Sequence, residues 1–306
     1  MRLVFAGTPE VAVPSLNALV ESDHEVVAVV TRPDARSGRG RTLHPSPVAA
    51  RAAELGLEVL KPERPSQEEF VTRLTELAPD CCPVVAYGAL VPQRVIDVPR
   101  HGWVNLHFSL LPRWRGAAPV QHAVIAGDTE TGACTFSLVR AMDAGPVHDE
   151  IRTPIGPTST AGALLDELAI SGAGLLVRTV DAIAAGRAEP TPQTDEGVTM
   201  APKITVDDAR IDFARPAVEL DRLVRGCHPA PGAWALFRGA RFKINSASPV
   251  AGTAPPGQLQ VAKQSVHVGT GDGLLELGEI QPPGKKPMRA ADWARGVQLD
   301  PDETLT

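Results

Sequence analysis

The sequence predicts an α/β fold: a Rossmann-like, mostly parallel sheet with helices on both faces, followed by a small C-terminal β-barrel of the OB-like type. Two observations lead to this prediction. In the first half of the chain, short valine-rich runs alternate with helical patterns at the spacing that joins parallel strands. After the first two thirds, short strand-like runs follow one another between glycines and prolines, which is typical of a small barrel.

The first strand is expected at residues 3–6, an apolar run that ends in a Gly7-Thr8-Pro9 turn. This turn lacks the G-x-G-x-x-G pattern, so we expect the topology without a dinucleotide site. Gly56 is placed to end one helix, and Ser66-Gln67-Glu68-Glu69 has the spacing of a capping box that opens another. The other strands are expected at 25–31, 58–60, 80–86, 102–107, 132–139 and 147–152, and helices at 10–22, 47–55, 66–77, 117–126 and 160–185.

The composition of the chain changes before the expected second domain. Residues 190–206 are rich in proline, threonine and acids, which is typical of a linker. We therefore expect domains at 1–189 and 207–306. In the second domain a helix is expected at 216–225 and strands at 233–237, 241–247, 257–263, 265–269 and 273–280.

The chain has 306 residues, 43% of them hydrophobic and 22% charged, with a net charge of -6, ordinary values for a globular protein. The four cysteines form no C-x-x-C pair, and Cys81 and Cys82 lie in an apolar run, which favours a reduced protein. Neither a secretory signal nor a long apolar run is visible. We expect a cytoplasmic monomer without membrane contact.

The stretch 104–116, V-N-L-H-F-S-L-L-P-R-W-R-G, concentrates polar chemistry. Asn105 and His107 are two apart, so a strand would place both on one face. With Asp143 they permit three interpretations: polar residues satisfied in a packed sheet, a metal site that also uses His101, or acyl transfer by direct attack. The metal site lacks the usual ligand spacings. Acyl transfer needs an oxyanion donor, an imidazole and an orienting carboxylate, and one of each is present.

Two further segments could bind ligands. Residues 32–47 carry several arginines against one acid, which suits either a solvated surface loop or a contact to phosphates. Residues 86–90 follow a buried strand at its carboxyl end, where open parallel sheets bind ligands, although a plain strand-to-loop transition would look the same.

Together these motifs resemble the folate-dependent formyltransferases, and most closely those that act on methionine carried by initiator tRNA. The central stretch matches as N-L-H-x-S-L-L-P-R-W-R-G-A-A-P-V, followed by M-D-A-G. The resemblance runs along nearly the whole chain. It includes F-A-G-T-P-E at 5–10, R-P-D at 32–34, G-R-G at 38–40, P-S-P-V at 45–48, V-V-A-Y-G at 84–88, A-R-I-D at 209–212, T-G-D-G at 270–273 and P-P-G-K-K-P-M at 282–288.

The resemblance implies transfer of a formyl group from 10-formyltetrahydrofolate to the α-amino group of methionyl initiator tRNA, by direct amine attack and without a metal. It implies that Asn105 and His107 stabilise the oxyanion and that Asp143 tunes His107. The implied folate contacts are Tyr87, Gly88, Leu90, Ser109, Leu110, Leu111 and Pro112. The implied tRNA contacts are Arg36, Arg39, Arg41, Lys203, Lys285 and Lys286.

Two alternatives stay open at this point. A formyltransferase acting on a small amine, such as glycinamide ribonucleotide or an amino sugar, would share Asn105, His107 and Asp143. It would need neither the arginine-rich loop nor a second domain. A non-catalytic RNA-binding protein that kept the fold is the alternative of another class, and the intact trio argues against it.

Overall fold

The computed structural model describes residues 1–37, 42–300 and 302–306. The chain forms two compact units. The first comprises Met1–Gly116, Thr131–Thr153 and Leu165–Met200, and the second comprises Ala117–Glu130, Pro154–Leu164 and Ala201–Thr306. The chain passes from the first unit to the second for the last time between Met200 and Ala201, within the expected 190–206 linker. The exact domain limits given above stay a prediction.

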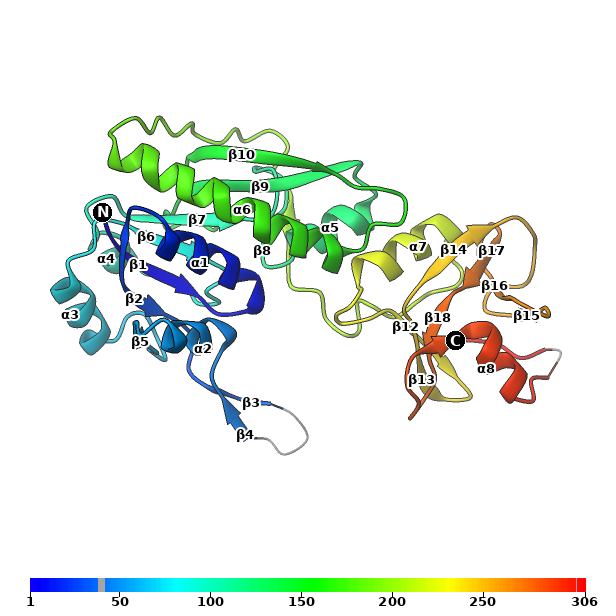
Figure 1. Ribbon diagram of the computed structural model, residues 1–306. Helices are drawn as coiled ribbons and strands as arrows, with labels where there is room; N and C mark the ends of the chain where they lie inside the picture. The colour runs from blue at the N-terminus through cyan, green and yellow to red at the C-terminus, as the bar shows by residue number, and fades with distance from the viewer. Residues whose placement is uncertain (38–41, 301) are drawn as a thin grey trace. The chain divides into compact units, whose positions relative to one another are not determined.

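A sheet of seven strands, counted over the described residues, forms the centre of the first unit (Figure 1). Its order is β10-β9-β7-β6-β1-β2-β5. The parallel strands are β1 (Arg2–Gly7), β2 (Glu25–Val30), β5 (Glu58–Leu60), β6 (Cys82–Val85) and β7 (Trp103–His107). β9 (Glu130–Ser137) pairs antiparallel with β7, and β10 (Val147–Pro154) follows it at the edge. The predicted Rossmann-like, mostly parallel sheet is confirmed.

Helices cover both faces of this sheet. α3 (Glu68–Leu77) and α4 (Gln93–Ile96) bury Leu74 and Val95 in one apolar cluster with Val4 of β1. On the other face, α6 (Ala161–Ala184) approaches β7 so closely that a Cβ on Gly172 would lie 3.0 Å from Leu106 Cδ2. α1 (Val13–Glu21) and α2 (Pro47–Glu54) pack against each other and against β2.

Two helix starts differ from the prediction. The expected helix at 10–22 opens as a 3-10 turn, η1 (Glu10–Ala12), and continues as α1, since Pro14 stands in the first turn of α1 where its missing N–H costs nothing. The predicted capping box is wrong, because the N-cap of α3 is Gln67 and no side chain caps it. The backbone carbonyl of Ser66 instead accepts a hydrogen bond from Arg94, a residue of α4.

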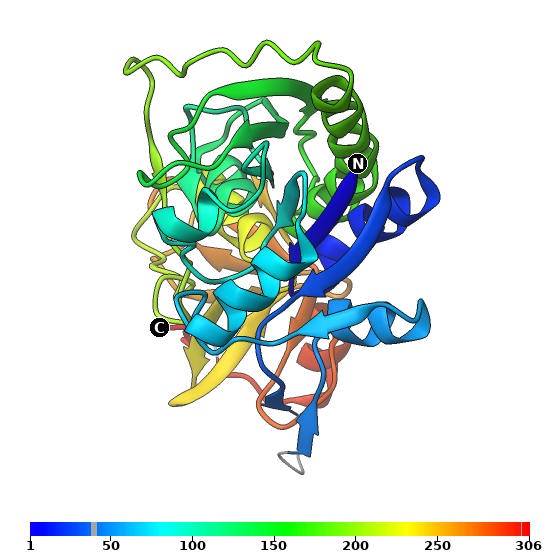
Figure 2. The ribbon, with the colours of Figure 1, turned by 90° about the vertical axis from the view of Figure 1, so that its left-hand side faces the viewer.

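The arginine-rich segment 32–47 contains two short strands rather than only a loop. β3 (Ala35–Ser37) pairs antiparallel with β4 (Thr42–His44), with Arg36 opposite Leu43. This pair projects from the rest of the first unit in two perpendicular views (Figures 1 and 2). Arg39 and Arg41, which the sequence marks as tRNA contacts, lie outside the described residues.

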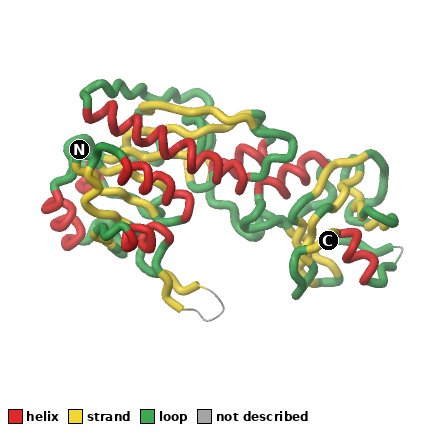
Figure 3. The backbone as a smooth tube through the Cα atoms, in the orientation of Figure 1, coloured by secondary structure: helices red, strands yellow, loops and turns green. Residues whose placement is uncertain are grey.

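The second unit is rich in strands, as Figure 3 shows. Its two four-stranded sheets have the orders β12-β13-β18-β19 and β14-β17-β16-β15, counted over the described residues. The strands are β12 (Trp234–Phe237), β13 (Ala240–Ile244), β14 (Ala247–Val250), β15 (Leu259–Val261), β16 (Val266–Gly269), β17 (Leu274–Leu277), β18 (Glu279–Gln281) and β19 (Met288–Arg289), and the helices are α5 (Pro119–Ala126), α7 (Ala217–Gly226) and α8 (Ala290–Gly296). Closure of these sheets into a barrel stays a prediction.

Two runs expected as single strands are each divided between the two sheets. The chain passes from β13 to β14 at Asn245 and Ser246, and from β17 to β18 at Gly278. Both changes occur at one point, because Ser246 Oγ accepts the Glu279 N–H at 2.8 Å and Ser246 O accepts the Gly278 N–H at 2.9 Å. A Cβ on Gly278 would lie 2.4 Å from Ser246 Oγ, so glycine is required for this close approach.

The core of the second unit contains an aromatic cluster. Phe242 is fully buried, and its ring centroid lies 6.0 Å from that of Phe237 and 4.9 Å from that of Trp293. In the first unit, Cys81, Cys82 and Cys134 are buried free thiols, as Cys227 is in the second. No helix within the described ranges combines the length and hydropathy needed to cross a bilayer.

Candidate active site

Strand β7, an inner strand next to the central β6, places Asn105 and His107 on one face of the sheet. Leu106, between them, points to the opposite face and packs on α6. Asn105 pairs with Val84 of β6 on one side and with Phe136 of β9 on the other. Its side chain is partly exposed and makes no hydrogen bond to any described residue. The amide is therefore held in place by the strand and left able to donate to a ligand.

The His107 imidazole is buried, with 6% of the side chain exposed. Its Nε2 lies 2.9 Å from Trp114 O, and since a carbonyl only accepts, Nε2 carries the proton of the neutral ring. The other nitrogen, Nδ1, lies 3.9 Å from Asp143 Oδ2. The ring also meets Phe136 edge to face, with centroids 6.2 Å apart.

Burial lowers the pKa of His107 below its ordinary value of 6.5, because the charged ring loses its hydration. The Asp143 carboxylate and the hydrogen bond to Trp114 O act in the opposite direction. The effect of burial outweighs these two, so the pKa of His107 is lowered and the imidazole is neutral at pH 7. Nδ1 is then the nitrogen that can gain a proton, and the nearby carboxylate favours the ion that results.

Asp143 comes from the loop between β9 and β10, and the structure brings its carboxylate to within 3.9 Å of the His107 ring. Its Oδ2 accepts the Gly116 N–H at 2.8 Å. Its backbone has φ +47°, in the left-handed region, and Trp114 shares this feature with φ +61°. Non-glycine residues in such conformations cost on the order of 1–3 kcal/mol each and persist where surrounding contacts hold them.

The expected folate contacts fall into different environments. Ser109 is fully buried, and its hydroxyl donates to Arg113 O at 2.7 Å, so it shapes the turn after β7. Leu110, Leu111 and Pro112 are partly exposed in that turn. Whether any of these residues touches folate stays a prediction.

At the carboxyl end of β6 the chain turns sharply. Ala86 has φ +46° and Gly88 has φ +83°. Tyr87 is 2% exposed and its side chain belongs to the apolar cluster under α3, whereas Leu90 is 80% exposed. Within the described chain, the backbone N–H groups of 88–90 and 140–142 donate no hydrogen bond, so the loop after β6 and the loop after β9 both present free donors.

The expected tRNA contacts that the structure describes are all exposed. Arg36 lies on β3 in the first unit, and Lys203, Lys285 and Lys286 lie in the second. Their exposure permits binding to phosphates and equally permits simple hydration.

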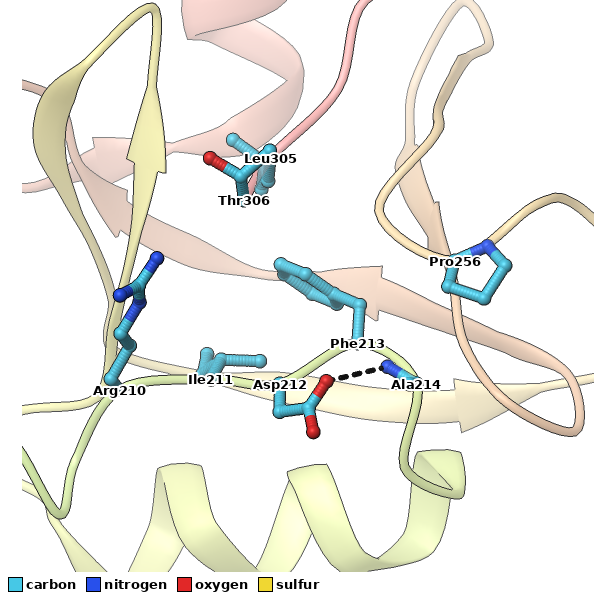
Figure 4. A pocket seen from close by; sticks show the side chains of 8 residues that line it. All are labelled: Arg210, Ile211, Asp212, Phe213, Ala214, Pro256, Leu305 and Thr306. Carbon is cyan, nitrogen blue, oxygen red and sulfur yellow. Dashed lines mark hydrogen bonds between the residues drawn. The ribbon is translucent and has the colours of Figure 1, made fainter.

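Two hollows among the described residues lie away from the Asn105, His107 and Asp143 side chains, which line neither of them. One, of about 320 Å³, lies in the first unit and is lined in part by Arg32, Arg64 and Leu90. The other, of about 500 Å³, lies in the second unit; Figure 4 shows Arg210, Asp212 and Phe213 on its walls. No described group of three or more His, Cys, Asp or Glu side chains is placed to hold a metal ion.

Sequence reasoning missed Gln193 and Thr199, which hydrogen-bond to the loops that carry the site. Gln193 contacts Arg115 and the Asp143 backbone, and Thr199 contacts Trp114. No local signal could have found them, since both lie in a segment whose composition indicates a linker.

Solved structures share the fold of this chain. A sugar 3N-formyl transferase, WlaRD, superposes with a TM-score of 0.70 at 15% identity, covering 94% of this chain and 99% of that one. HypX from Aquifex aeolicus superposes with a TM-score of 0.67 at 19% identity, covering 98% of this chain and 49% of that one. The formyl transferase family matches residues 1–180, and the formyl transferase C-terminal domain matches 203–298.

This chain belongs to the formyl transferase family. The methionyl-tRNA formyltransferase of Thermobifida fusca (strain YX) is 62% identical over 305 residues, which are 99% of this chain and 98% of that protein. The methionyl-tRNA formyltransferase of Mycolicibacterium vanbaalenii is 57% identical over 305 residues, 98% of each chain. These relatives therefore span both units of the present chain.

Proposed function

We propose that this chain transfers the formyl group of 10-formyltetrahydrofolate to the α-amino group of methionine on initiator tRNA. The observation that carries the proposal is the Asn105 amide, without a protein partner among the described residues, on the same strand face as a buried His107 that faces Asp143. The relatives named above give the substrate, because their similarity extends over both units of the chain.

Asn105 acts as the oxyanion donor in this proposal. Its amide donates to the formyl oxygen, on which negative charge grows as the amine attacks. A preorganised donor of this kind is typically worth about 3–4 kcal/mol, or a factor of about 10²–10³ in kcat. Because β7 is paired on both sides, the amide needs little reorganisation when charge develops.

In this proposal His107 acts as general base and then as general acid. The neutral ring accepts the proton lost by the amine at Nδ1, and the resulting imidazolium is stabilised by Asp143, 3.9 Å away. The same ring then returns a proton to the leaving nitrogen. Trp114 O holds Nε2 throughout, so the ring keeps one orientation.

We propose that the folate binds at the loops that follow β6 and β9. 10-Formyltetrahydrofolate supplies the formyl group, and its flat pterin ring needs hydrogen-bond partners on one plane. The free N–H groups of 88–90 and 140–142 suit such a ring. We propose that Gly88 and Leu90 contact the ring side and that Leu110, Leu111 and Pro112 contact the remainder, while Tyr87 and Ser109 support these loops from inside.

The tRNA contacts are proposed on the exposed cations. Arg36, Arg39 and Arg41 would bind near the acceptor end, and Lys203, Lys285 and Lys286 would bind elsewhere on the tRNA. Phosphate contacts release counterions, so KM for tRNA should rise with salt. We expect Arg39→Ala to raise KM for tRNA while KM for folate stays within about twofold, and Arg187→Ala, an exposed arginine outside this set, to change neither. Equal loss toward both substrates would contradict this role.

Because charged initiator tRNA is made in the cytoplasm, the chain is proposed to act there. It is proposed to act as a monomer, which light scattering at working concentrations measures directly.

The decisive experiment offers several amines to the purified chain with 10-formyltetrahydrofolate. Methionyl initiator tRNA, free methionine, glycinamide ribonucleotide and a nucleotide-linked amino sugar are compared side by side. We expect formylation of the tRNA-bound amine alone, and we expect Asn105→Asp, which keeps the shape but removes the N–H donors, to lower kcat about 10²–10³-fold. Formylation of a small amine in its place, or tRNA binding without formylation in the wild type, would overturn the proposal.

A further inference from the structure

The segment 191–199, which its composition marks as a linker, runs along the candidate active site and bonds to it; we call it the strap. Its first contact is a bridge in which Thr191 and Val147 exchange both backbone hydrogen bonds at 2.8 Å. Its last is Thr199, whose Oγ1 accepts the Trp114 N–H at 2.9 Å and whose carbonyl accepts the Arg115 N–H at 2.9 Å. The strap is thus tied to the loop after β7 and to the start of β10.

Gln193 lies between these ends, and every donor and acceptor of its side-chain amide is hydrogen-bonded. Nε2 donates to Asp143 O and to Gly145 O, both at 2.8 Å. Oε1 accepts from Arg115 Nε at 3.1 Å and from Arg115 Nη2 at 2.7 Å. A primary amide has two donor hydrogens and two acceptor positions, and all four are filled. A side chain saturated in this way has one orientation and links two loops rigidly.

These two loops carry the contacts that define the trio. The loop with Arg115 supplies Trp114 O to His107 and Gly116 N to Asp143. The loop with Gly145 supplies Asp143 itself. Asp143 stands at φ +47°, a conformation that an aspartate keeps only where its surroundings hold it. Gln193 holds the carbonyl of this residue, while Gly116 holds its carboxylate.

Resting on the proposed function, we propose that Gln193 is a positioning residue that sets Asp143 against His107. None of the four Gln193 side-chain hydrogen bonds goes to the imidazole or the carboxylate. Gln193 acts through the Asp143 and Gly145 carbonyls and through Arg115. Without Gln193 the loop keeps the Gly116 N–H bond to the Asp143 carboxylate and the Ser137 N–H bond to Pro146 O, but loses the bonds to the Asp143 and Gly145 carbonyls. The carboxylate can then move away from Nδ1, and misplacement by about 1 Å is enough to cost two orders of magnitude in rate.

The test uses Gln193→Ala and Gln193→Glu in the full chain. Gln193→Glu keeps the acceptor toward Arg115 and removes the two donated bonds. We expect kcat to fall 10–100-fold in both variants, with KM for tRNA and for folate within threefold. Thr194→Ala is the matched control and should behave as wild type, because the Thr194 hydroxyl lies in the same strap and donates to Glu196 O, away from the loops that carry the trio.

The pH profile separates positioning from a general loss of structure. Asp143 is the charged group acting on His107, while Cys134, opposite on β9, stays neutral because burial raises its thiol pKa to about 12. If Asp143 moves away, the acid limb of kcat/KM, which reports His107, should shift to lower pH. Unchanged kcat and an unchanged acid limb in both Gln193 variants would overturn the inference.

A double variant tests whether Gln193 acts through Asp143. If Gln193 acts through Asp143, adding Gln193→Ala to Asp143→Asn should lower kcat by less than threefold further. Multiplying losses would show an independent role and overturn the inference. Failure of the proposed function would be seen separately, as a wild-type chain that does not formylate methionyl-tRNA. The inference about Gln193 is tested only by comparing the kcat of the variants with that of the wild type.

Discussion

Substitution of Gly145 by alanine tests whether the position of the Asp143 loop determines the rate. A Cβ built there would lie 1.8 Å from Ser137 O, a backbone atom that cannot swing aside. Since real Cβ contacts stay beyond 3.0 Å, Gly145→Ala must displace the loop or the strand by about 1.2 Å. Asp143 lies two residues away in the same short loop, so we expect its carboxylate to move by a similar distance.

A displacement of about 1 Å at a reacting group lowers rates about 100-fold. Overpacking of this kind also costs about 1–3 kcal/mol of stability, or a few degrees in Tm. The assay is the initial rate of formyl-methionyl-tRNA formation at saturating substrates, with thermal unfolding followed in parallel. We expect kcat to drop about 100-fold, and a chain still folded at the assay temperature.

Gly174→Ala is the matched control. It is the same chemical change in α6 of the first unit, where a Cβ would meet nothing within 4 Å. Because alanine favours a helix over glycine by about 1 kcal/mol, this variant should be as active as wild type and at least as stable. Our reasoning would be refuted if Gly145→Ala kept kcat within threefold of wild type with the same Tm.

Three further expectations follow from single observations. Since burial holds the His107 pKa below its ordinary 6.5, the unfolded chain takes up this proton first as pH falls, and stability should decline below about pH 6.5 by up to about 1.4 kcal/mol per pH unit; His107→Gln should remove that part of the slope in urea titrations at several pH values. Phe242→Ala empties a fully buried aromatic site and should lower the unfolding free energy by about 3–5 kcal/mol, whereas a loss below about 1 kcal/mol would mean that the cluster is loosely packed. Asp221→Asn weakens the 2.9 Å ion pair with Arg225, whose side chains are only 11% and 13% exposed, and should cost about 1–3 kcal/mol with little dependence on salt; strong screening by salt would contradict the burial.

The sheet was predictable because its signals are local and repeated. Valine-rich strands alternate with amphipathic helices, and this pattern survives small errors at each boundary. The helix that ends at Gly56 behaves as expected, with Gly56 at φ +70° just past the C-cap Leu55. The capping box at Ser66 failed because a single hydroxyl competes with tertiary contacts, here the hydrogen bond from Arg94 to the Ser66 carbonyl.

The division of strands in the second unit was not predictable. The sequence predicts one strand over 241–247 and another over 273–280, because alternation does not record in which sheet a residue pairs. Only when Ser246 and Gly278 meet does each strand change sheets. The meeting depends on two segments far apart in the sequence, so neither segment alone contains the information.

By itself the sequence determined the fold class, the family resemblance and the placing of Asn105 and His107 on one strand face, since these depend on residue types and short periodicities. Only the tertiary structure decided how Asp143 reaches His107 and that the His107 pKa is lowered. It also decided that the 191–199 strap carries Gln193, whose partners lie 78, 50 and 48 residues away along the chain. The physical reason is that a hydrogen bond requires two groups within about 3 Å, and the distance between remote residues is set by the packing of the whole unit.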